Sequence, residues 1–297
     1  LMYGSYRQPR ELLWLIGMVI YVAMMATAFF GYLLPWGQMS YWGAQVIVSL
    51  AGAIPVVGDG LVEWVRGDFF ISDITLNRFF ALHVVAVPLI LVALVALHII
   101  ALHHVGSTSP DGVEIKENKG PDGVPVDGVA FHPFHTSKDL IAICLFFIAF
   151  FGVVFFAPEA GGYFLEHANF EPANPLKTPE HIAPVWYFTP FYAILRAVPD
   201  KLGGVLLMGG AMILLFFLPW LDRGKVRSIR YRGWMFRTAL ALFVISFIAL
   251  GYLGTQPATG VYTRLAQIFT AIYFAFFIFM PIYTKLDPTK PVPDRVT

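Results

Sequence analysis

The chain has 297 residues, of which 58% are hydrophobic and only 13% carry a charged side chain, and its formal net charge is +1. Soluble proteins carry about 25% charged residues, so this composition excludes a water-soluble enzyme and a disordered regulator. The balanced charge, without a basic stripe, excludes a nucleic-acid binder. The single cysteine excludes a disulfide framework and a thiolate zinc site. The sequence therefore predicts an all-α polytopic membrane protein.

Six apolar stretches are long enough to cross a bilayer core, which takes about 20 helical residues. The segment before the first stretch is polar and no small-residue cleavage site follows that stretch, so a signal peptide is excluded. Six crossings place both termini on one side of the membrane. In chain order, the predicted spans cover residues 11–34, 79–102, 139–157, 204–221, 235–254 and 264–284.

Lysine and arginine predict the orientation, because loops rich in these residues stay in the cytoplasm. They are concentrated before the first and third spans, between the fourth and fifth spans, and after the last span. The two segments on the opposite side hold fewer of them. We therefore expect both termini of this chain in the cytoplasm.

The segments 35–77 and 158–203 are far longer than ordinary connections, and loops of that length are usually functional or disordered. Both are rich in aromatic and aliphatic residues, so we expect short helices on the outer membrane surface, for example over 41–53 and 186–198. The predicted divisions are an N-terminal region over 1–105, a hydrated cytoplasmic loop over 106–138, a C-terminal region over 139–285 and a cytoplasmic tail over 286–297.

The second span holds two histidines, His83 and His98. An ionisable side chain at this depth is a candidate functional residue, because leaving it unpartnered costs several kcal/mol. The intervening helix rises about 22 Å and returns both side chains to roughly one face. This geometry suits two separate ligand-bound centres, one near each side of the membrane, and does not suit a binuclear metal site. The alternative is a pair of histidines that hydrogen-bond between packed helices.

The first span holds two glycines, Gly17 and Gly31, with nearly the same separation, about 21 Å along a helix. Glycine removes the side chain where another group must approach the backbone. The matched spacing would let two flat macrocycles lie against this helix. Ordinary small-residue packing between membrane helices produces the same pattern and is the alternative.

Four segments carry a more specific signal: GYLLPWGQMSYWG at 31–43, NRFFALH at 77–83, PANPLKTP at 172–179 and YAILRAVPDKLGG at 192–204. They resemble cytochrome b, the quinol-oxidising core subunit of respiratory cytochrome bc complexes, and the resemblance extends from residue 1 to about 285. In that family eight helices hold two b-type haems, each between a histidine of the second helix and one of the fourth.

The resemblance implies that the six spans correspond to the third to eighth helices of the family. It implies that His83 and His98 are axial haem ligands and that Gly17 and Gly31 contact the haems. The second axial histidines are missing from this chain, so we expect an N-terminally truncated fragment, or else a separate polypeptide that supplies them. One residue more separates the two histidines than in mitochondrial-type members, and a wide helical turn before Pro88 would absorb it.

The resemblance also implies a quinol-oxidising site at the outer face, framed in the family by a Pro-Glu-Trp-Tyr motif. Here the motif is Pro184-Val185-Trp186-Tyr187, and valine cannot accept a proton. We expect Glu166 to accept the proton instead; the alternative is a solvated loop residue. The residues that match pocket positions of the family are Tyr32, Gly43, Pro184, Trp186, Tyr187 and Tyr192.

On the cytoplasmic side, His103 and Asp139 match a histidine and an aspartate that contact the quinone being reduced in the family. An imidazole and a carboxyl group can supply the two protons that this reduction needs. The alternative for Asp139 is to stabilise the first turn of its helix through the helix dipole.

The function implied by the resemblance is that of a quinol–cytochrome c reductase. One electron passes to a Rieske iron–sulfur protein and a c-type cytochrome, and the other crosses two b-type haems to quinone, coupled to proton translocation. A homodimer of the complex and, from the Pro-Val-Trp-Tyr motif and the charged loop, a bacterial inner membrane are also expected. The alternatives are a transporter with intramembrane histidines, which would show inverted repeats, a chlorophyll-containing relative of photosynthetic membranes, and a fragment inactive by itself.

Overall fold

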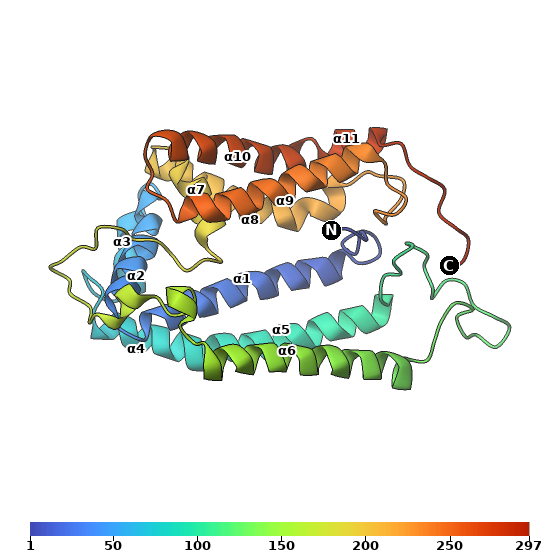
Figure 1. Cartoon of the computed structure of the whole chain (residues 1–297), viewed down its shortest axis with the longest axis horizontal. Coiled ribbons are helices and arrows are strands. Elements are labelled where there is room, and N and C mark those ends of the chain that lie inside the picture. The colour runs from blue at the N-terminus through green and yellow to red at the C-terminus, as the bar shows by residue number, and fades with distance from the viewer. Residues whose placement is uncertain (297) are drawn as a thin grey trace.

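Six helices are long and apolar enough to cross a membrane, in the order that the sequence predicts (Figure 1). The computed structural model describes residues 1–296, and within that range it contains helices and two isolated β-bridges but no strand. The six segments are α1 (Glu11–Leu33), α4 (Asp73–Ala81) continuing into α5 (Val87–Val105), α6 (Thr136–Phe156), α8 (Lys201–Leu221), α9 (Trp234–Gly254) and α10 (Gly260–Ile278).

Helix ends differ from the predicted spans where capping residues act. The second span begins at Asp73 rather than at residue 79, and at the first turn of α4 the Thr75 hydroxyl accepts a hydrogen bond from the Ser72 N–H at 3.1 Å. The last span ends at Ile278 rather than at 284. A short helix, α11 (Met280–Leu286), follows with Pro281 in its first turn, and proline cannot donate the backbone hydrogen bond that would continue α10.

The helices form two packed groups. In one, α1 lies along α5, and α4 also contacts α1; in the other, α7 (Thr189–Arg196), α8, α9 and α10 pack around an aromatic core. Phe243 stacks on Phe276 in that core, with ring centroids 4.4 Å apart. Helix α6 differs, because most of its apolar side chains stay exposed. Its composition suits contact with lipid or with a subunit outside this chain.

Short helices gather at one end of the molecule, opposite the two termini (Figure 1). They are α2 (Gln38–Leu50), α3 (Gly58–Arg66) and α7, and α2 and α7 fall close to the surface helices predicted over 41–53 and 186–198. Both termini lie towards the other end, as an even number of crossings requires.

The segment after α5, predicted as a hydrated loop, is anchored in its first part. Asp111 is only 2% exposed and Arg10, equally buried, forms a two-point ion pair with Glu114 (2.7 and 2.9 Å). Arg227 from the α8–α9 connection also pairs with Glu114. A loop that is simply hydrated needs no ion-pair partners. The first part of this segment is instead held by ion pairs to segments distant in the sequence, which its polar composition alone does not predict.

Candidate functional site

His83 lies in a wide helical turn, Leu82–Ala86, between α4 and α5. The turn immediately precedes Pro88, which has no backbone N–H to donate to the preceding turn. A π-type turn accommodates one residue more than a regular α-helical turn. The structure therefore contains the wide turn predicted from the spacing of the two histidines.

The imidazole of His83 points to α1, where its Nδ1 lies 2.8 Å from the carbonyl oxygen of Thr27. The ring lies directly against Gly31: a Cβ atom at that position would sit 2.7 Å from Nδ1 and 2.9 Å from Nε2. No real side chain tolerates such distances, so residue 31 must be glycine for this ring position.

The imidazole of His98 also points to α1, about 22 Å along the helix from His83. A Cβ atom on Gly17 would lie 3.2 Å from its Cε1 and 3.7 Å from its Nδ1. The Nδ1 atom is buried and makes no hydrogen bond within residues 1–296. Each histidine of the second span thus faces one glycine of the first, whereas the matched spacings predict a macrocycle, not the imidazole itself, at each glycine.

These residues fit one side of two haem sites. A histidine that binds metal through Nε2 usually donates its Nδ1–H to a carbonyl oxygen, which fixes the ring and the tautomer. His83 and the Thr27 carbonyl have that arrangement. The two glycines let each imidazole lie close to the backbone of α1, which any added side chain would prevent at residue 31.

A cavity of about 330 Å³ lies between α1, α2, α8 and the segment 182–195. Its walls are almost wholly apolar, and its size is in the range of small-molecule sites. Three predicted residues line it: Gly43, Pro184 and Tyr192. The Tyr192 hydroxyl donates to the carbonyl of Ile182 (3.2 Å), which fixes the ring at the wall.

Glu166 lies beside this cavity and is hydrogen-bonded to a second predicted residue. The Tyr32 hydroxyl donates to Oε2 of Glu166 at 3.0 Å. Gly43, which lines the cavity, lies next to the Tyr32 ring, since a Cβ atom there would be 3.8 Å from Cε1. Tyr32 thus lies next to a residue of the cavity wall, although neither Tyr32 nor Glu166 lines the cavity itself. Glu166 is half-buried and keeps a route to water.

Trp186 and Tyr187 lie outside the cavity lining. The Trp186 ring stacks on Tyr163, with centroids 6.2 Å apart, and packs edge-on against Tyr187. Burial raises the pKa of the Tyr187 hydroxyl, so this group keeps its proton at neutral pH. It can serve as a hydrogen-bond donor.

The two residues predicted for the inner site do not contact each other in the described part of the chain. His103 lies in the last turn of α5 and Asp139 in the first turn of α6, and both side chains are exposed. No hydrogen bond or ion pair joins them in the described part of the chain. The carbonyl of His103 accepts a hydrogen bond from Lys116 Nζ (2.7 Å). The position of Asp139 also fits the alternative role at the start of its helix.

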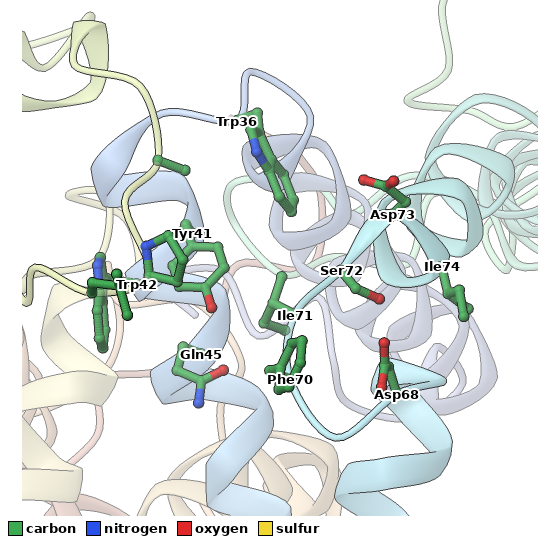
Figure 2. Close-up of a pocket in the computed structure, with 13 residues that line it drawn as sticks. Trp36, Tyr41, Trp42, Gln45, Asp68, Phe70, Ile71, Ser72, Asp73 and Ile74 are labelled. Atoms are coloured by element: carbon green, nitrogen blue, oxygen red, sulfur yellow. The ribbon is translucent and has the colours of Figure 1, made fainter.

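A larger groove, of about 870 Å³, lies between α2 and the segment before α4. Figure 2 shows Tyr41, Trp42 and Gln45 on one side and Asp68 and Asp73 on the other. None of the predicted site residues lines this groove.

Comparison with known proteins decides the family. A family model described as cytochrome b(N-terminal)/b6/petB matches residues 1–190, and one described as cytochrome b(C-terminal)/b6/petD matches residues 172–274. The chain belongs to the cytochrome b family. This assignment, over nearly the whole chain, replaces the alternative of a transporter.

Several bacterial cytochromes b are similar over the full chain. That of Allochromatium vinosum is 63% identical over 305 residues, which cover 100% of this chain and 73% of that protein. That of Rhodospirillum rubrum is 50% identical over 298 residues, 100% of this chain and 71% of that protein. Among solved structures, a chain of a hyperthermophilic respiratory Complex III is 40% identical, with a TM-score of 0.86 over 95% of this chain and 72% of that one.

Two neighbours of the cytochrome b site residues were not predicted. The carbonyl of Thr27 holds His83, and the side chain of Asn169 binds Ser40 beside the Tyr32–Glu166 pair. A backbone carbonyl carries no side-chain signal, although Thr27 stands one helical turn before Gly31. Asn169 binds Ser40, which lies 129 positions away in the sequence, and no local sequence pattern predicts a contact over that separation.

Proposed function

We propose that this cytochrome b chain oxidises quinol at the outer face of a bacterial inner membrane and supports quinone reduction at the inner face. In this proposal it works within a quinol–cytochrome c reductase that couples the reaction to proton translocation. The observation that carries the proposal is the pairing of His83 with Gly31 and of His98 with Gly17 on one helix. Two metal ligands about 22 Å apart along a membrane helix suit electron transfer across the bilayer.

His83 and His98 each supply one imidazole to a b-type haem, and the haems carry single electrons when bound. The Thr27 carbonyl orients His83 and makes its free nitrogen a stronger donor. His98 lacks that partner within this chain. The two ligands are thus held differently by the same helix.

The outer cavity takes the quinol ring against Gly43, Pro184 and Tyr192. Glu166 accepts a proton from the quinol hydroxyl through Tyr32: the tyrosine oxygen takes the quinol proton while its own proton passes to Oε2, at the observed 3.0 Å. Half-exposed, Glu166 then releases the proton to the outer water. Val185 has no group that can accept or release a proton. Trp186 and Tyr187 pack against each other outside the cavity lining.

At the inner face we assign proton delivery to the imidazole of His103 and the carboxyl group of Asp139. Both side chains are exposed to the aqueous side, which allows them to be reprotonated. An imidazole and a carboxyl can each deliver one proton to a quinone that has received two electrons.

The expected partners are a Rieske iron–sulfur protein and a c-type cytochrome, in a dimeric complex. A similar protein of Bradyrhizobium diazoefficiens, 45% identical over 298 residues (100% of this chain and 42% of that protein), is named cytochrome b/c1, which supports the second partner. The clustering of lysine and arginine at the end of the bundle that holds both termini supports cytoplasmic termini.

Replacement of Glu166 by glutamine tests the outer site. Glutamine keeps the size of the side chain but cannot take a proton, so we expect quinol oxidation by the intact complex to fall about 100-fold, within the usual range for a lost acid–base group. Glu180, an exposed carboxylate of the same segment, provides the matched control: Glu180→Gln should leave turnover near that of the unmodified complex. Near-normal turnover of Glu166→Gln would remove Glu166 from the mechanism.

A further inference from the structure

We propose that Asn169 is a positioning residue that holds Glu166 against Tyr32, an inference that rests on the proposed role of Glu166. The side chain of Asn169 makes two hydrogen bonds to one residue, Ser40. Its Oδ1 accepts from the Ser40 N–H at 2.8 Å, and its Nδ2 donates to the Ser40 hydroxyl at 2.9 Å. Two bonds to a single, fully buried residue fix both the position and the rotation of the amide.

The Asn169–Ser40 contact caps the first turn of α2 with a side chain from another segment of the chain. Ser40 lies in the first turn of α2, where backbone N–H groups have no partner within the helix. The residue that precedes α2 is Gly37, which has no side chain to cap it. A Cβ atom on Gly37 would lie 2.6 Å from Cγ of Asn169, so the same glycine that cannot cap the helix leaves room for the amide that does.

Asn169 and Glu166 belong to one tight turn. The backbone N–H of Asn169 donates to the carbonyl of Glu166 at 2.9 Å, and the turn His167–Phe170 begins directly after Glu166. On the other side, Tyr32 and Ser40 flank the short connection between α1 and α2. The Asn169–Ser40 bonds therefore fix the same junction at which Tyr32 donates to Glu166.

The rest of the outer segment has its own anchor. The side chain of Gln38 accepts from the backbone N–H of Asn174 at 2.7 Å and donates to the carbonyl of Lys177. Its backbone N–H donates to the carbonyl of Glu171 at 2.8 Å. Loss of the Asn169 side chain should therefore loosen the Glu166 turn without detaching the whole segment from α2.

Asn169→Ala in the intact complex tests this role. We expect kcat for quinol oxidation to fall roughly tenfold, because a displacement of about 1 Å of a catalytic group costs up to about 100-fold. KM should stay within about twofold, since Asn169 does not line the cavity. Asn174→Ala is the matched control: its side chain binds only its own turn, at the Leu176 N–H (2.9 Å), so turnover should be unchanged.

The double variant separates positioning from general damage. If Asn169 acts only through Glu166, then Asn169→Ala should cause no further loss in a Glu166→Gln background, whereas independent effects multiply. Multiplied losses, or a loss no larger than that of Asn174→Ala, would overturn the inference and leave the proposed role of Glu166 intact. Normal turnover of Glu166→Gln alone would instead overturn the proposed role of Glu166.

Discussion

Gly31 and Gly17 face the two membrane histidines at different distances, and the difference has a consequence for each side chain. The ring of His83 is tethered to the Thr27 carbonyl and lies too close to Gly31 for any added atom. The ring of His98 has no such tether, and a Cβ atom on Gly17 would be 3.2 Å from it. A methyl group at residue 17 thus requires a shift of a few tenths of an ångström, whereas one at residue 31 requires the tethered ring to move.

We therefore expect Gly31→Ala to perturb the outer haem site strongly and Gly17→Ala to perturb the inner one weakly. Overpacking of this kind costs about 1–3 kcal/mol. A redox titration of the b-type absorbance in the intact complex measures both effects, as a shift or loss of one component. Equal shifts in the two variants would contradict the difference in tethering.

At the residue level, the sequence predicts the depth at which residues lie when helical periodicity relates them. The spacings of His83 and His98 and of Gly17 and Gly31 predict two sites at matched depths on neighbouring helices, but not that each imidazole itself lies against a glycine. The hydrogen bond between Tyr32 and Glu166 could not be predicted in this way, because 134 residues separate the partners and the irregular segment after α6 has no period. The hydrogen bonds between Asn169 and Ser40 could not be predicted for the same reason.

At the level of helices, apolar length predicts the six spans, and local capping decides where they end. The inner ends of α1, α8 and α9 are joined by buried polar contacts. Tyr6 donates to Oδ2 of Asp222 (2.6 Å), and Arg232 forms a two-point ion pair with the same carboxylate. Asp222 and Arg232 are 5% and 2% exposed. These contacts hold the connecting segments together, which apolar patterning alone does not predict.

This ion pair should make stability depend on pH. Burial alone would raise the pKa of Asp222, but hydrogen bonds and charge from Arg232 and Tyr6 hold it below the usual value. A carboxyl group with a lowered pKa in the folded state stabilises the protein above its unfolded pKa, about 3.9, and loses that contribution as the pH falls towards the folded value.

Asp222→Asn leaves Arg232 buried without a counter-charge, so we expect a loss of about 3 kcal/mol at neutral pH. Thermal unfolding of the detergent-solubilised complex at pH 7 and at about pH 3, below the unfolded pKa of about 3.9, measures the effect. The gap between the variant and the unmodified protein should narrow at the lower pH. A gap of the same size at both pH values would contradict a lowered pKa for Asp222.

At the level of the whole molecule, the two ends of the helix bundle hold different groups of residues. The end opposite the two termini carries the short helices α2, α3 and α7 (Figure 1). The cavity and the Tyr32–Glu166 pair involve α1, α2 and the segment after α6, whereas the buried ion pair of Asp222 and Arg232 lies between α8 and α9. Helix α6 and the outward faces of α1 and α5 expose apolar side chains. The fold thus follows from hydropathy, whereas the contacts of the predicted site residues also depend on segments distant in the sequence.

The ratio of b-type haem to polypeptide in the intact complex tests the central claim most directly. We expect two haems per chain in the unmodified complex and one in each of the single variants His83→Leu and His98→Leu. The two variants should lose different components of the redox titration, since the two imidazoles face different glycines. A variant that keeps both haems, or two variants that lose the same component, would contradict the assignment of His83 and His98 as ligands of separate centres.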